Sequence, residues 1–375
     1  MVLANQKHLF DIPPDVTYLN CSYMSPLSLR VKEAGASGIQ KRGAPWELKI
    51  SDWFDPGEQV RKLVASLIHS DPENIGLIPS VSYGIAVAAK NITLKPHQTI
   101  VLLDQQYPSN VYPWRNLSRD SGATLITVTK EHGQSWTEAL TANITEATGL
   151  VAVPNCHWTD GSLIDLEVIS ARAKRMGSHL VIDASQSLGA YPLDIRKIRP
   201  DFLVSVGYKW LMGSYGLGYL YADDRYCRDG VSIEEGWLNR KGSEDFSRLV
   251  DYRDELKSGG RRFDGGEYPD FVRLPMAIAA LTQVSEWGVA DIQETLAGLT
   301  AEIERRAQLA GYEAPRRADR VGHMIGIKIP PDQVAAISRK LADRRVFVSF
   351  RGSSMRVAPH LYNDVADIQK LCDLL

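Results

Sequence analysis

The stretch that decides the fold covers residues 181–221 and reads VIDASQSLGAYPLDIRKIRPDFLVSVGYKWLMGSYGLGYLY. Asp183 closes the short apolar run VID, and Lys209 follows the apolar run FLVSVGY, just before a glycine-rich turn. Short apolar runs bounded by turn signals predict buried strands. The stretch therefore predicts an acid at the end of one strand and an amine at the end of the next.

An acid and an amine held together at strand ends suit the binding of an aldehyde cofactor. A lysine amine is the usual partner for a Schiff base, and pyridoxal 5'-phosphate (PLP) needs a carboxylate beside its ring nitrogen. We therefore expect Lys209 to bind PLP covalently and Asp183 to keep the ring nitrogen protonated. The alternative that this stretch leaves open is a buried Asp–Lys ion pair.

The rest of the chain alternates short apolar runs with helical patterns, as α/β proteins do. Strand candidates lie at residues 99–103, 124–128, 150–153, 180–182, 202–206 and 218–221. The alternation predicts a mostly parallel sheet with helices on both faces, in which ligands bind beyond the carboxyl ends of the strands. Asp104, Asn155, Asp183 and Lys209 all fall at or just past such ends.

A second pattern begins after residue 222, where charge and glycine increase. Helices predicted at 275–287, 291–310, 332–344 and from 364, with strands at 323–329, 346–350 and 355–358, indicate a smaller α+β domain. We expect a PLP-binding large domain over residues 16–265 and a small domain made of residues 1–15 and 266–375. Capping boxes predict that one helix starts at Asp55 and another at Asp291.

Composition excludes several classes of protein. The 375 residues carry a net charge of −2, and no basic stripe indicates a nucleic-acid partner. Neither a signal peptide nor a membrane span is indicated. The four cysteines form no CxxC pair, which is typical of reduced thiols and not of a zinc site. We therefore expect a cytoplasmic protein with no metal, membrane or nucleic-acid partner.

Further residues match the parts of a PLP site. Ser80, Val81 and Ser82 precede an apolar helix, whose N-terminus can bind a phosphate, and Tyr208 is a second candidate donor. Each of these residues also has an ordinary structural interpretation, for the serines as a helix cap. Tyr107, just after a strand, is placed to stack on a cofactor ring.

Amides and arginines complete the candidate set. Asn155 and Gln186 carry amides able to bind a ring oxygen, although turn positions explain them equally well. Arg356 can bind a substrate carboxylate through two hydrogen bonds, and nearby Arg351 can share that role. The alternative for both arginines is a solvated surface. No GxGxxG opens a helix after a first strand, and no P-loop occurs, which disfavours a nicotinamide or nucleotide site.

Taken together, these residues resemble the class V branch of fold-type I PLP enzymes, which contains cysteine desulfurases, selenocysteine lyases, kynureninases, isopenicillin N epimerase-like proteins and several aminotransferases. The resemblance runs from YLNCSYMSPLS at 18–28 to RVAPHLYN at 356–363. Its most specific parts are the segment DASQ at 183–186, DFLVSVGYKW at 201–210 and QYPSNVYPW at 106–114.

The resemblance implies roles for the candidate residues. Lys209 forms the Schiff base, Asp183 pairs with the ring nitrogen, Gln186 and Asn155 contact the ring oxygen, Tyr107 stacks on the ring, Val81, Ser82 and Tyr208 hold the phosphate, and Arg356 binds the substrate carboxylate. It also implies a homodimer with active sites near the interface, in which the neighbouring subunit supplies the Gly265-Gly266 loop. Desulfurases carry a catalytic cysteine just before the carboxylate-binding arginine, whereas residues 350–355, FRGSSM, have none.

The resulting expectation is a PLP-dependent enzyme acting on a small α-amino acid, either as an aminotransferase or as a lyase that removes a β-carbon substituent, without a persulfide cysteine. These motifs leave two alternatives open, an amino-acid epimerase and a non-catalytic PLP-fold binding protein. A nicotinamide-linked dehydrogenase is disfavoured by the missing glycine fingerprint.

Overall fold

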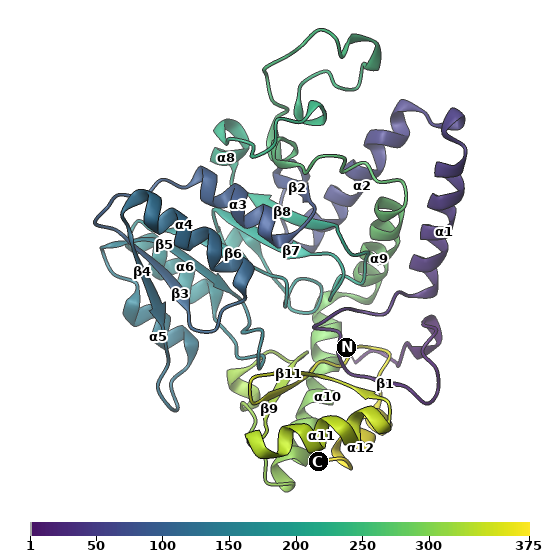
Figure 1. The fold of residues 1–375 in the computed structure, drawn as a ribbon, viewed down its shortest axis with the longest axis vertical. Coiled ribbons are helices and arrows are strands. Elements are labelled where there is room, and N and C mark those ends of the chain that lie inside the picture. The colour runs from purple at the N-terminus through teal and green to yellow at the C-terminus, as the bar shows by residue number, and fades with distance from the viewer. Residues whose placement is uncertain (1) are drawn as a thin grey trace.

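A seven-stranded sheet forms the centre of the computed structural model, which describes residues 2–375 (Figure 1). The strand order is β2 (Ile75–Ile78), β8 (Gly218–Ala222), β7 (Phe202–Val206), β6 (His179–Asp183), β5 (Thr148–Pro154), β3 (Thr99–Leu103) and β4 (Thr124–Val128). The five strands β7, β6, β5, β3 and β4 run parallel to one another, and β8 runs antiparallel to both β7 and β2. The predicted α/β class with a mostly parallel sheet is confirmed.

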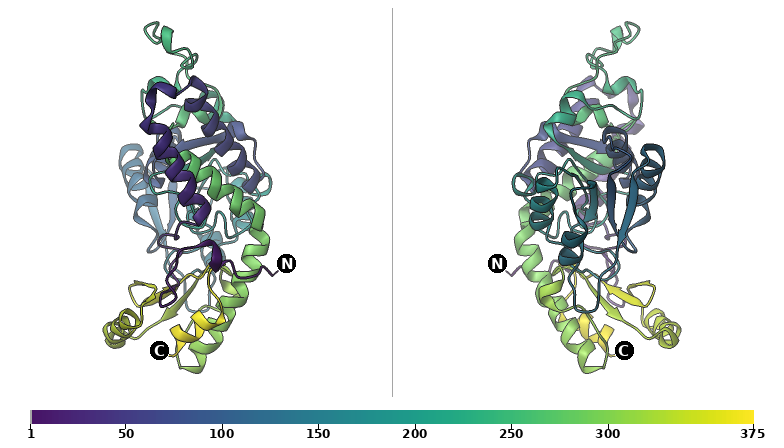
Figure 2. Two further views of the ribbon diagram at one scale, coloured as in Figure 1. Left: turned by 90° about the vertical axis from the view of Figure 1, so that its right-hand side faces the viewer. Right: turned by 90° about the vertical axis from the view of Figure 1, so that its left-hand side faces the viewer.

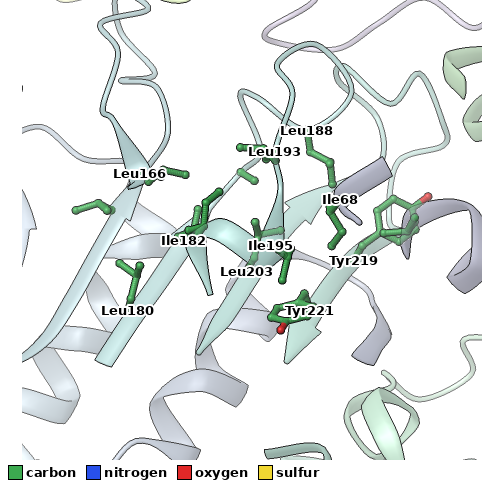
Figure 3. Packing of buried hydrophobic residues seen from close by; sticks show 14 of the residues in the cluster. Ile68, Leu166, Leu180, Ile182, Leu188, Leu193, Ile195, Leu203, Tyr219 and Tyr221 are labelled. Atoms are coloured by element: carbon green, nitrogen blue, oxygen red, sulfur yellow. The ribbon is translucent and has the colours of Figure 1, made fainter. Parts of the chain in front are cut away.

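Helices cover both faces of this sheet (Figures 1 and 2). One face packs against α2 (Ile50–Ile68), α5 (Trp136–Asn143), α6 (Leu166–Arg175), α7 (Ile195–Ile198) and α9 (Arg273–Trp287). The other packs against α3 (Val81–Asn91), α4 (Tyr112–Ser121) and α8 (Asp224–Asp229). Because side chains alternate along a strand, Ile182 joins the first layer and Val181 the second. Figure 3 shows Ile182 and Leu203 within the first layer.

The strand register aligns the edge of the sheet where the candidate residues lie. Pro154 at the end of β5 pairs with Asp183 at the end of β6, and Asp183 pairs with Val204 in β7. Lys209 follows β7 by three residues in the turn toward β8. The carboxyl ends of three neighbouring parallel strands therefore meet on one side of the molecule, where α/β proteins bind ligands.

A smaller α+β region lies below the central sheet in Figure 1. Its antiparallel sheet has the order β11 (Ser349–Arg351), β12 (Ser354–Val357) and β9 (Ile325–Lys328), with α10 (Val289–Leu309), α11 (Pro331–Asp343) and α12 (Val365–Cys372) around it. The N-terminal β1 (Thr17–Tyr18) joins this region by pairing in parallel with β10 (Val346–Phe347). The domain division at residue 265 stays a prediction.

The two helix starts that capping boxes predicted, at Asp55 and Asp291, were both wrong. Helix α2 begins at Ile50, so Pro56 lies inside it, and Asp52 accepts the Lys49 N–H at 2.8 Å. The Trp53 ring packs edge-on against Phe271 with ring centres 5.3 Å apart, so tertiary packing extends the helix N-terminal of the proline. Helix α10 begins at Val289 after Gly288, which places Asp291 inside its first turn.

Several elements of the structure were not predicted from the sequence, among them one long helix and one edge strand. Helix α1 (Leu29–Gly43) packs on α9, and the short strand β2 forms the edge of the central sheet. A long segment between α8 and α9 projects from the top of the molecule in Figure 1. Among residues 2–375, no helix has the length and apolar character needed to cross a membrane.

Candidate active site

A pocket of about 190 Å³ opens at the carboxyl edge of the central sheet. It brings together the predicted residues Val81, Ser82, Tyr107, Asp183, Gln186, Tyr208 and Lys209. These residues come from four separate segments, which begin α3, follow β3, end β6 and follow β7. The fold therefore collects in one place the residues that the sequence analysis grouped by function.

Lys209 lines this pocket. Its side chain is buried, and its Nζ lies 5.6 Å from the centre of the Tyr107 ring and 6.0 Å from that of Tyr208. Burial lowers the pKa of Lys209 to about 8, with Asp183 acting against this shift and Arg356 adding to it. Since only the neutral amine is a nucleophile, the pocket prepares Lys209 to react near neutral pH.

The turn that carries Lys209 needs its glycines. The Gly207 N–H donates to Leu217 O at 2.9 Å, and the Gly213 N–H donates to Gly207 O at 2.8 Å. A Cβ on Gly207 would lie 2.8 Å from Leu217 O, closer than any side chain tolerates. The glycine-rich sequence therefore closes the turn tightly and points the lysine at the sheet edge.

Asp183 supplies a buried carboxylate to the same pocket. Its Oδ1 accepts the Ser185 N–H at 3.0 Å, and the side chain is 6% exposed. Burial raises the pKa of Asp183, while the Ser185 hydrogen bonds and the Lys209 charge act in the opposite direction. A buried carboxylate next to an amine is suited to pair with a protonated ring nitrogen.

The start of α3 provides donors at another part of the wall. Ser80 caps this helix by accepting the Tyr83 N–H at 3.2 Å, and Ser82 Oγ donates to Ser109 Oγ at 3.0 Å. The first N–H groups of a helix have no partner within it, so Val81 and Ser82 present free donors. This arrangement fits a phosphate. Ser109, which lines the pocket, was missed by the sequence analysis.

Aromatic side chains form the remaining wall. Tyr107 meets Trp158 edge to face, with ring centres 5.4 Å apart, and Trp158 Nε1 donates to Gln105 O at 2.6 Å. Tyr215, whose ring centre lies 4.7 Å from that of Tyr208, also lines the pocket but is 69% exposed. Tyr215 had no sequence signal beyond its place in the glycine-rich turn.

The structure does not bring Asn155 to the pocket. Pro154 and Cys156 line the wall, and Asn155 between them instead donates from its side chain to Ile164 O at 3.2 Å. Neighbouring residues of an extended chain point to opposite sides, which explains this placement. Gln186 does line the pocket, where it donates to Ser22 O and accepts from Trp210, each at 3.0 Å. The ring-oxygen contacts of both amides stay predictions.

Arg356 and Arg351 lie behind the aromatic wall. Arg356 is buried, and its Nη1 donates to Trp158 O at 2.7 Å. Its guanidinium lies 6.0 Å from the centre of the Trp158 ring, and that of Arg351 lies 5.3 Å from it. Burial, and then the charge of Arg351, lower the pKa of Arg356 to about 9. Both predicted carboxylate-binding residues therefore contact Trp158 without lining the pocket themselves.

The chain belongs to the class-V aminotransferase family, whose model matches residues 54–371. It is 26% identical over 349 residues to an uncharacterized aminotransferase, YcbU, of Bacillus subtilis (strain 168), covering 93% of this chain and 89% of the relative. An apo cysteine desulfurase from Thermococcus onnurineus NA1 has a similar fold (TM-score 0.85, 21% identity, 100% of this chain and 98% of that chain). So does a lysine-to-alanine mutant of C-DES with glycine covalently linked to its PLP cofactor (TM-score 0.86, 20% identity, 98% of each chain).

The protein is thus a PLP-dependent transferase or lyase, and its cofactor is PLP. The residues of the pocket fit this cofactor. An amine for the aldehyde, a buried carboxylate for the ring nitrogen and a helix N-terminus for the phosphate all meet in one cavity. Few other ligands would suit this pocket, because it combines a reactive amine, a carboxylate that favours a cation and a helix N-terminus that favours an anion.

Proposed function

We propose that the protein acts on a small α-amino acid through the amine of Lys209, by transamination or by removal of a substituent from the β-carbon. The observation that carries this proposal is the buried Lys209 amine, whose pKa is lowered to about 8 in a pocket shared with Asp183.

We assign the pocket residues separate roles in cofactor binding and proton transfer. Asp183, Tyr107, Val81, Ser82 and Tyr208 would hold and orient PLP. When bound, PLP supplies an electron sink for negative charge on the substrate α-carbon. Lys209 in its neutral form takes the α-proton onto Nζ, and the burial of its own side chain limits competition from water. Arg356 is proposed to bind the α-carboxylate in two-point fashion.

We propose no persulfide step on the enzyme. Residues 350–355 contain no cysteine, and Cys156 is the thiol that lines the pocket. Cys156 is 1% exposed, and burial raises its pKa. The thiolate is the reactive form of cysteine, so a thiol held protonated is a poor sulfur acceptor.

Epimerisation is the second candidate function, an alternative that the candidate residues leave open. An epimerase returns the proton to the α-carbon from the face opposite the one that lost it, which requires a second proton donor. An inverted α-carbon among the products distinguishes this function from transamination and elimination.

We also propose a cytoplasmic homodimer with active sites near the subunit interface. Tyr215 supports this arrangement, because it lines the pocket while 69% of its side chain stays exposed for a second subunit to cover. Whether the Gly265-Gly266 loop reaches the neighbouring site stays a prediction, as does the division into a large domain ending at residue 265.

The test is an amino-acid screen on the PLP-loaded protein, with products followed as keto acid, ammonia, sulfide or an inverted α-carbon. Borohydride should fix the cofactor to Lys209, and the Lys209→Ala variant should lose turnover while keeping its fold by circular dichroism. A protein that takes up no PLP, or a Lys209→Ala variant with wild-type turnover, would overturn the proposal. An inverted α-carbon as sole product would select the epimerase.

A further inference from the structure

Two arginines contact one indole without a negative partner. The guanidinium carbons of Arg351 and Arg356 lie 5.3 and 6.0 Å from the centre of the Trp158 ring. Over residues 2–375, neither arginine forms an ion pair, and each uses Nη1 to bind a backbone carbonyl, of Phe350 and Trp158 respectively. Stacking on an indole stabilises a cation but does not neutralise it.

Positive charge exceeds negative charge around Arg351, Arg356 and Lys209. Arg356 is 1% exposed, and its Nε is a buried donor with no partner in the described chain. Lys209 adds a third cation close by, and Asp183 is the carboxylate that acts on it. Because buried charges are normally paired, the buried Arg356 guanidinium, with the half-buried Arg351 also unpaired beside it, indicates a site that binds anions.

The Trp158 ring lies close to both arginines, and Arg351 lines a second cavity. Trp158 lines the Lys209 pocket, whereas Arg351 lines a neighbouring cleft of about 1060 Å³ together with Thr159 and Gln105. Two other cations of this cleft already have carboxylate partners, since Arg316 pairs with Asp319 at 2.7 Å and Lys328 with Glu313 at 3.3 Å. Lys130 lies over a different indole, that of Trp136. Unlike Arg316, Arg351 therefore has no carboxylate partner and is available to bind an anionic ligand.

We propose that Arg351 determines specificity by binding an anionic group on the substrate side chain, while Arg356 binds the α-carboxylate. The substrate class is then an α-amino acid with an acidic side chain that extends past the Trp158 ring toward the cleft. This inference rests on the proposed function, because it takes the Lys209 pocket as the site of the amino group. A single carboxylate held by both arginines is the competing arrangement.

The test measures binding of unreactive carboxylates to the PLP-loaded protein by titration calorimetry. Succinate and glutarate carry two anionic groups, and butyrate and valerate carry one at similar length. We expect the dicarboxylates to bind about tenfold or more tightly, since a charge-assisted hydrogen bond supplies that factor. The Arg351→Gln variant should remove this advantage and leave monocarboxylate affinity within about twofold, whereas Arg356→Gln should weaken both classes.

Matched variants make the result interpretable. Arg316→Gln removes an arginine from the same cleft that Asp319 already neutralises, so it should keep the dicarboxylate preference. Arg351→Lys keeps the charge without the planar fork and should retain part of it. Equal weakening of both ligand classes by Arg351→Gln, or no weakening, would overturn the proposal, as would equal affinity in the wild type. Turnover confined to neutral amino acids would refute this inference alone, and failure to bind PLP would refute the proposed function.

Discussion

Arg61 binds Asp264 through two hydrogen bonds, from Nη1 to Oδ1 at 3.0 Å and from Nη2 to Oδ2 at 2.5 Å, with both side chains buried. The same carboxylate accepts the Leu77 N–H at 2.8 Å. The pair therefore fastens α2 and β2 to the residue that precedes Gly265, close to the segments that form the pocket.

Removing one member of this pair should destabilise the protein strongly. Arg61→Leu leaves a buried carboxylate without its cation, which typically costs about 3–5 kcal/mol. The free energy of unfolding from urea titrations measures the loss. Arg316→Leu is the control, because its pair with Asp319 is exposed and contributes about 1 kcal/mol or less. Similar losses in the two variants would contradict the role assigned to burial.

Uptake of PLP should depend on the ionisation of Lys209. Its pKa is lowered from 10.5 to about 8, so the amine becomes neutral and reactive as the pH rises through about 8. The rate at which apo-protein gains the absorbance of bound PLP should rise with pH to a plateau, with its midpoint near 8. Asp183→Asn removes a charge that raises this pKa and should shift the midpoint to lower pH. A midpoint near 10.5 would show that burial does not act on this amine.

Gly189 should tolerate no side chain. Its φ is +97°, and a Cβ would lie 2.6 Å from Trp210 O, beside the Lys209 turn. Gly177 shares a positive φ of +68° but has open space around it. Gly177→Ala should therefore cost about 1 kcal/mol of backbone strain, whereas Gly189→Ala should cost about 1–3 kcal/mol more from the clash. Thermal unfolding of the two variants gives the comparison, and equal losses would contradict it.

Two buried histidines should make the protein sensitive to acid. Burial lowers the pKa of His360 to about 3 and that of His323 to about 4, against an ordinary value of 6.5. Below pH 6.5 the unfolded chain binds protons that the folded chain does not, so stability should fall as the pH drops toward 4. Each histidine contributes a slope of up to about 1.4 kcal/mol per pH unit.

His360→Leu tests this contribution. The variant should show a shallower loss of unfolding free energy between pH 6.5 and 4.5 than the wild type, whatever its stability at neutral pH. Urea titrations at several pH values measure the slope. Parallel slopes would show that His360 does not bind protons on unfolding in this range.

The large sheet was predictable because its central strands are buried on both faces and mostly apolar. The ranges 99–103, 124–128 and 202–206 matched β3, β4 and β7 in full. Strand β2 was harder to recognise, since Ile75–Ile78 is four residues long and contains Gly76. The start of α2 failed because a proline signal at Pro56 was outweighed by aromatic packing around Trp53, which links residues far apart in the chain.

The candidate active site was also predictable only where local sequence patterns carry the information. Lys209 and Asp183 were found because strand ends are visible in sequence. The sequence did not show whether Asn155 or its neighbour Cys156 faces the pocket, because the position of a strand end does not fix which side each residue points to. The contacts of Trp158 with Arg351 and Arg356 join residues almost 200 positions apart, and no local pattern records them.

The pairing of β1 with β10 has a consequence for how the chain is made. Thr17 pairs with Val346, so β1 cannot pair with β10 until residues near the end of the chain have been synthesised. Contacts of such long range form slowly, and the domain that holds them leaves the ribosome last. During synthesis the central sheet can therefore assemble first. Arg351 and Arg356, on strands that follow β10, take their positions beside Trp158 only when the chain is nearly complete.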